Sequence, residues 1–110
     1  MLEETAQKIE DAIRKLGPAQ SPAKKEILSL LTALKSEVAE FSKTHAEHAH
    51  SIAGLTQLAA HEATRREKSP AMLSHALDGL KRSTEGFEVS HPKLVETLND
   101  VCTTLAAIGI

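Results

Sequence analysis

The sequence predicts an all-α protein of four helices with one long central helix, packed as a dimeric helical bundle. Alanine and leucine dominate its apolar residues, and the 110 residues include two phenylalanines but neither tyrosine nor tryptophan. This composition favours helices that pack through small and aliphatic side chains, since sheets use more β-branched and aromatic residues. Apolar residues also recur at alternating steps of four and three, and prolines and glycines divide this pattern into segments.

The first predicted helix covers residues 2–16. Its apolar stripe, which we call a seam, consists of Leu2, Ala6, Ile9, Ile13 and Leu16. Gly17-Pro18 stops this helix. Ser21-Pro22 then predicts the start of a second helix, because serine caps free amides and proline suits the first helical position.

The second predicted helix, residues 22–67, is the long central one. A continuous helix of this length extends about 69 Å, beyond the diameter of a compact domain of this size. Gly54 is its weak point, where we expect any bend or break to fall. Its seam also passes through His45 and His48. The core and interface residues predicted on it are Leu31, Leu34, Val38, Phe41, Ile52 and Leu55.

Two shorter helices complete the chain, at residues 70–86 and 91–108. Ser69-Pro70 marks the start of the first of them. The start of the second lies in Ser90-His91-Pro92, where Ser90 is a candidate N-cap and Pro92 sits in the first turn. We expect Phe87 to pack under the turn between the two helices.

These lengths predict a single helical domain, residues 1–110, that pairs with a second copy of itself. The first helix reaches only the N-terminal half of the long helix, and the last two helices cover only its C-terminal half. An N-terminal hairpin of two helices would leave apolar residues such as Leu28 and Leu30 open to water. Two such hairpins joined as a symmetric coiled-coil dimer would bury them.

The C-terminal half resembles a known family. The segments HEATRREKSP and LDGLKRSTEGFE, followed by GFEVSHPKLVETLNDVCTTLAAIGI, are similar to short bacterial proteins grouped as domain-of-unknown-function family 4404. The shared features are the Phe-Glu-x-Ser-His-Pro element, the helix after it, and the terminal Gly109-Ile110. This resemblance implies a helical fold and a bacterial source. It implies no activity, cofactor or catalytic residue.

The histidine-rich stretch KTHAEHAH, residues 43–50, is where the sequence comes closest to suggesting chemistry. His45 and His48 are three residues apart on one helix face, whereas His50 points away. Three interpretations compete. The imidazoles are neutral polar residues that fix the packing register, or they form a metal site with a facing helix, or they make the seam sensitive to pH.

The other sequence patterns that resemble catalytic motifs are incomplete. The stretch beginning at His61-Glu62 lacks the second histidine of a zinc-protease helix, because the fifth position is Arg65. Cys102 lies near the last seam and is expected to be a small core residue. Ser74, His75 and Asp78 lie on one helix, which does not create the geometry of a catalytic triad.

The function favoured by the sequence is therefore a non-enzymatic oligomerisation or protein-interaction module without a cofactor. The alternative is a metal- or pH-responsive regulator that uses His45, His48 and His50. The net charge of −2 is spread evenly along the chain. The sequence has no basic face and too few aromatics to stack on bases, so it gives no indication of nucleic-acid binding. No stretch approaches a membrane span, and the lone cysteine fits a reducing compartment. We expect a cytoplasmic homodimer, with an unidentified protein as a further candidate partner.

Overall fold

A computed structural model describes residues 2–17 and 21–109 and is helical throughout its regular elements. The all-α prediction is confirmed. Within the described residues there are five helices, not four: α1 (Leu2–Arg14), α2 (Ser21–Ser42), α3 (Ala46–Thr64), α4 (Pro70–Arg82) and α5 (Pro92–Gly109).

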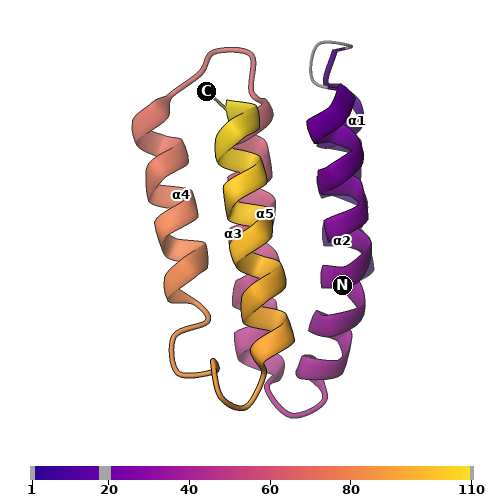
Figure 1. Cartoon of the computed structure of the whole chain (residues 1–110), viewed down its shortest axis with the longest axis vertical. Coiled ribbons are helices and arrows are strands. Elements are labelled where there is room, and N and C mark those ends of the chain that lie inside the picture. Colours follow the sequence, from indigo (N-terminus) through magenta and orange to yellow (C-terminus); the bar gives the residue numbers. More distant parts are fainter. Residues whose placement is uncertain (1, 18–20, 110) are drawn as a thin grey trace.

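The helices run alternately up and down in a short bundle (Figure 1). The α2–α3 turn and the α4–α5 loop lie together at one end, at the bottom of the view, and the α3–α4 loop lies at the other end. The helix α3 is central, because it contacts every other helix. The principal extents are 38 × 24 × 21 Å and the Cα radius of gyration is 13.0 Å, close to the roughly 13 Å expected of a compact chain of about 100 residues.

The predicted continuous helix over residues 22–67 is wrong. The chain leaves the helix after Ser42 and starts a new one at Ala46, so α2 and α3 pack against each other as an antiparallel pair. The break therefore lies at residues 43–45 and not at Gly54, which sits exposed inside α3.

Local hydrogen bonds explain why the helix ends where it does. The amides of Lys43 and Thr44 donate to carbonyls only three residues back, which tightens the last turn of α2. The hydroxyl of Ser42 donates to the carbonyl of Ala39 at 2.7 Å, and serine and threonine that bond the backbone in this way weaken a helix. His45 then leaves helical geometry, with φ −136° and ψ 58°. The apolar repeat continues through this break, so the repeat alone predicts an unbroken helix. The packing of α2 and α3 on each other and on α1 and α5 outweighs that local preference.

The core residues predicted on the long helix now lie on α2 and α3 and are buried or half-buried within one chain. Phe41 is 1% exposed, and Leu55 on α3 is half-buried against the core. The other members of the predicted set are all buried: Leu31, Leu34, Val38 and Ile52.

The remaining boundaries differ by a few residues. Ser69 caps α4 as expected, since its hydroxyl accepts from the amide of Met72 at 3.4 Å. The helix α4 ends at Arg82, before the predicted limit of 86, and α5 begins at Pro92, with His91 rather than Ser90 directly before it. Some predicted features lie outside the described residues: the side chain of Leu2, Pro18, and Ile110 of the terminal Gly-Ile.

The structure removes the reason for which a dimer was predicted. With the long helix broken, α1 packs on both α2 and α3. Leu28 and Leu30, which an isolated hairpin would leave open, lie partly buried against the core of the same chain. Dimerisation itself stays a prediction.

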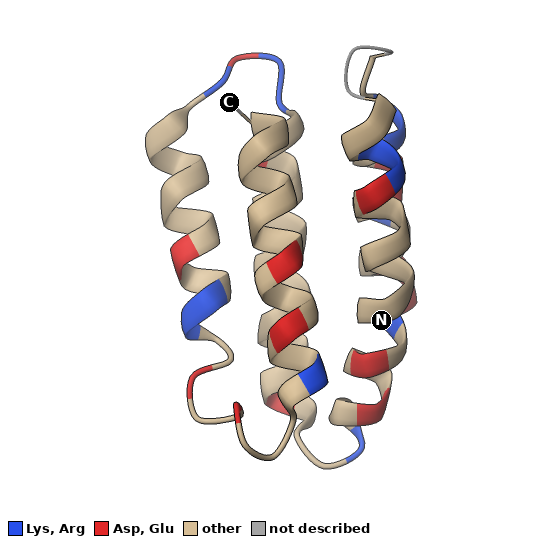
Figure 2. Ribbon diagram, in the orientation of Figure 1, with Lys and Arg blue, Asp and Glu red and all other residues tan. Residues whose placement is uncertain are grey.

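Charged side chains are interspersed over the bundle (Figure 2). Acidic and basic residues alternate along the same helices, whereas the halves of α4 and α5 near the α3–α4 loop carry neither. Among the described residues, no helix combines the length and apolar character that crossing a membrane requires.

Two glycines provide a test of this packing. A Cβ at Gly54 would meet no atom within 4 Å, so Gly54→Ala is expected to raise the free energy of unfolding by about 0.5–1 kcal/mol. A Cβ at Gly109 would collide with Leu73 Cδ2 and lie 3.3 Å from Ala63 Cα, so Gly109→Ala is expected to lower it by about 1–3 kcal/mol. Urea unfolding followed by circular dichroism measures both, and shifts of the same sign would contradict the packing.

Candidate functional site

Five rings gather at the end of the bundle where the α2–α3 turn meets the α4–α5 loop. They are Phe41 at the end of α2, His45 and His48 around the start of α3, and Phe87 and His91 before α5. Both phenylalanines of the chain and three of its six histidines belong to this ring cluster. Two motifs that lie some forty residues apart in the sequence therefore form one site.

Phe41 is the buried member of the ring cluster and contacts three of the other four rings. The imidazole of His45 stacks on it, with centroids 4.7 Å apart and an interplanar angle of 6°. Phe87 and His91 meet it edge-on, at 5.0 Å and 4.9 Å. His48 is the fifth ring, and its centroid lies 5.1 Å from that of Phe87. Edge-to-face and offset ring pairs of this kind add about 0.5–1.5 kcal/mol each beyond the burial of their surface.

Backbone geometry and hydroxyl groups position the rings. Gly86 has φ 94°, a conformation that other residues rarely adopt, and it turns the chain directly before Phe87. The amide of His91 then donates to the carbonyl of Phe87 at 2.8 Å. Nδ1 of His91 lies 3.0 Å from the hydroxyl of Ser90, and Nδ1 of His45 lies 2.8 Å from that of Thr44. The side chains at the predicted helix start thus orient an imidazole.

The histidines occupy different environments from those expected of a shared seam. His45 is half-buried and immediately precedes α3, whereas His48 and His50 are exposed. The third histidine of the ring cluster is His91, from the loop before α5. Across the described parts of the chain, no group of three or more His, Cys, Asp or Glu side chains is arranged to hold a metal ion.

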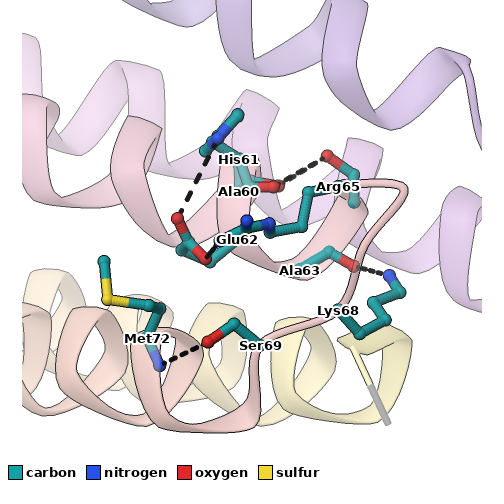
Figure 3. A network of polar contacts seen from close by, with 9 residues as sticks. Ala60, His61, Glu62, Ala63, Arg65, Lys68, Ser69 and Met72 are labelled. Atoms are coloured by element: carbon teal, nitrogen blue, oxygen red, sulfur yellow. Dashed lines mark hydrogen bonds and ion pairs between the residues drawn. The ribbon is translucent and has the colours of Figure 1, made fainter.

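A group of polar contacts lies at the other end of α3 (Figure 3). The carboxylate of Glu62 is 4% exposed and accepts a hydrogen bond from Nη1 of Arg65 at 2.7 Å, while Nε2 of His61 lies 3.9 Å from its other oxygen. Lys68 donates to the carbonyl of Ala63 in the same turn. Arg65 thus neutralises a buried carboxylate, which would be costly to leave unpaired.

The other catalytic candidates stay apart. Cys102 is 1% exposed, and burial raises the pKa of its thiol, an effect that the charge of Lys81 partly opposes. Ser74 and His75 are exposed, and Asp78 accepts from Nε of Arg82 at 2.9 Å. This hydrogen bond, together with the charge of Asp78, raises the pKa of Arg82.

Two hollows lie between helices. An indentation lies among α1, α2 and α3. Its volume is about 450 Å³ when the open space at its mouth is included. An open groove of about 1120 Å³ separates α4 from α5, with Leu73, Leu77 and Ala106 along it and Lys68 and Lys81 in its lining. The residues that line the indentation are mainly apolar and include Ala6, Ile9, Leu31, Leu34, Val38 and Ala53.

The ring cluster predicts a specific cost for losing Phe87. Its ring is half-buried and contacts four other rings, so Phe87→Ala should lower the free energy of unfolding by about 1–3 kcal/mol, below the cost of removing a fully buried ring. Val89→Ala, at a side chain 95% exposed, should change it by less than about 0.5 kcal/mol. Equal effects in chemical denaturation would show that the ring cluster contributes no stability.

Comparison with known proteins places this fold in a family. The model of a domain of unknown function, DUF4404, matches residues 27–110, which include α3, α4, α5 and most of α2 but leave α1 outside. No curated protein and no solved structure matches the chain. Because the family model covers well over half of the sequence, this chain belongs to the DUF4404 family.

Proposed function

We propose that this chain is a non-enzymatic protein-interaction module whose α2–α3 face binds an amphipathic helix. One observation carries the proposal: α1, which lies outside the segment matched by the family model, docks on that face through an apolar stripe. A surface that holds a helix within one chain has the shape and chemistry to hold a helix of the same pattern from another chain.

The contacts of α1 define what the face accepts. Ile9 and Ile13 are 4% and 0% exposed, whereas Glu3, Glu4 and Asp11 are exposed to solvent. The bound helix is thus apolar on one side and charged on the other, with branched apolar residues four positions apart. The buried side of this helix is apolar, and the ion pairs found among the described residues all lie within or just beyond a single helix, away from α1.

The indentation beside α1 shows that this packing is incomplete. Ala6 lies where the stripe faces α2 and α3, and its small side chain leaves space beside Leu34 and Val38. A helix with a larger apolar residue at this position would fill the space and bind more tightly, because each buried methylene contributes about 0.8 kcal/mol. The face therefore has room for a better-fitting helix than its own.

The alternative, a metal- or pH-responsive regulator using His45, His48 and His50, has less support. His50 lies outside the ring cluster, and the contacts within it are those of packed rings. These contacts explain how the imidazoles help to join two loops without requiring a ligand.

The proposal predicts binding of α1 in trans. Ile13→Asp in the full chain should undock α1 and leave the α2–α3 face open, since a carboxylate cannot replace a fully buried isoleucine without a large penalty. A synthetic peptide of residues 2–16 should then bind this variant with a Kd of about 0.1–1 mM, matching the few kcal/mol that two buried isoleucines contribute. Amide chemical shifts should move at Leu31, Val38 and Thr56.

Two matched peptides serve as controls. A peptide with Ala6→Leu should bind more tightly than the natural one, and a peptide with Asp in place of both Ile9 and Ile13 should not bind. The proposal is contradicted if the folded Ile13→Asp chain ignores the natural peptide. It is equally contradicted if that variant is wholly unfolded, because the face would then not exist without α1.

A further inference from the structure

We infer that the groove between α4 and α5 is a docking site for an amphipathic helix of another protein that carries an acidic residue near each of its ends. This groove lies apart from the α2–α3 face, so the inference goes beyond the proposed function and does not depend on it. Three features of the groove support it: its apolar floor, its two lysines and its length.

The floor of the groove is apolar and carries no charge. Leu73 is 7% exposed, and Leu77 and Ala106 are half-buried. Neither residues 69–77 nor residues 101–109 include an Asp, Glu, Lys or Arg, and Figure 2 shows these halves of α4 and α5 without charged residues. An apolar strip that is open to water gains free energy when a second apolar surface covers it.

A lysine lies at each end of this floor. Lys68 lies two residues before α4, and Lys81 is the residue before the last one of α4. Nζ of Lys68 donates to the carbonyl of Ala63, which holds this ammonium at the α3–α4 end of the groove (Figure 3). Among the described residues, no carboxylate forms an ion pair with either ammonium. Both lysines are therefore available to an acidic partner.

The carboxylate in the groove lining does not neutralise these lysines. Asp78 accepts a hydrogen bond from Nε of Arg82 at 2.9 Å, so its charge is already paired along α4. The groove thus presents two unpaired ammonium groups around an apolar floor. An acidic partner complements this pattern, whereas a basic partner is repelled.

The length and openness of the groove fit a helix. The helix α4 has 13 residues and is about 20 Å long, so the two lysines are separated by between three and four helical turns. The space along the groove, about 1120 Å³ with its open mouth, exceeds the roughly 300–1000 Å³ of small-molecule pockets. In the same chain, α1 lies on α2 and α3. The residues that line this groove come from α4, α5 and Lys68, so within the described part of the chain no third helix covers it.

The chemistry of the partner follows from these features. It is a helix of about four turns that places large apolar side chains on the floor and a Glu or Asp close to each lysine. Exposed ion pairs contribute little affinity each, so the apolar floor supplies most of the binding. The two lysines select the sign of the partner's charge and fix where the helix lies along the groove.

A designed peptide tests this site. The probe is a synthetic helix of about sixteen residues, with leucine along one face, glutamine on the other and one glutamate in each terminal turn. In the natural chain it should move the amide chemical shifts of Leu73, Leu77 and Ala106, with half-saturation below about 1 mM. The same peptide with lysine in place of both glutamates should bind about tenfold more weakly or less.

Charge reversal in the protein provides the matched control. Lys68→Glu combined with Lys81→Glu should weaken binding of the glutamate peptide and strengthen binding of the lysine peptide, each by about tenfold. Both positions are exposed, so the circular dichroism spectrum should not change. Lys25→Glu combined with Lys93→Glu alters the net charge equally at exposed positions outside the groove, and it should change either affinity by less than about threefold.

Each other outcome overturns the inference. A glutamate peptide that leaves the shifts unchanged at about 1 mM, or that binds equally well after charge reversal, contradicts it. Shifts that move at Leu31 and Val38 instead would place the peptide on the α2–α3 face. Stronger binding to phosphatidylglycerol vesicles, lost on charge reversal, would assign the groove to a lipid surface. None of these results alters the test in which residues 2–16 bind the Ile13→Asp chain, so the two proposals fail separately.

Discussion

The packing of Phe41 against rings from the α4–α5 loop is the interaction on which the rest of the structure depends. Phe41 is 1% exposed, and His45, Phe87 and His91 surround it at the end of the bundle. It joins the turn that reverses the chain after α2 to the loop that reverses it after α4. Because α2 and α3 are thereby held side by side, they form the face on which α1 lies.

Much of this fold is predictable from local features. Helical class follows from composition and from the seam, and the start of α4 follows from the capping chemistry of Ser69. The break at residues 43–45 is not predictable in this way, because the propensities of Ser42, Thr44 and His45 differ from those of good helix formers by only tenths of a kcal/mol. Burial of both helices against α5 and α1 outweighs such differences, and the sequence pattern alone does not reveal which distant helices will provide it.

The ring cluster illustrates the same limit. The motifs around His45 and around His91 each stand out in the sequence, but their meeting depends on how two loops come together in space. His48 continued the spacing of the seam, yet it is exposed, because it lies in the first turn of α3 at the end of the bundle, whereas Ile52 one turn further on is buried. For the Glu62–Arg65 pair a sequence signal existed, since residues three apart on a helix are neighbours. The burial of Glu62 required the fold.

The chain is thus a family domain in which a ring cluster joins two loops at one end of the bundle and α1 covers the face formed by α2 and α3. The most direct measurement of this organisation is the nuclear Overhauser contact between the ring of Phe41 and those of Phe87 and His91, recorded together with Cα chemical shifts. The account predicts cross-peaks between these rings, whose centroids lie 5.0 Å and 4.9 Å from that of Phe41, and a loss of helical shifts at residues 43–45. Continuous helical shifts through residues 22–67, without those cross-peaks, would contradict it.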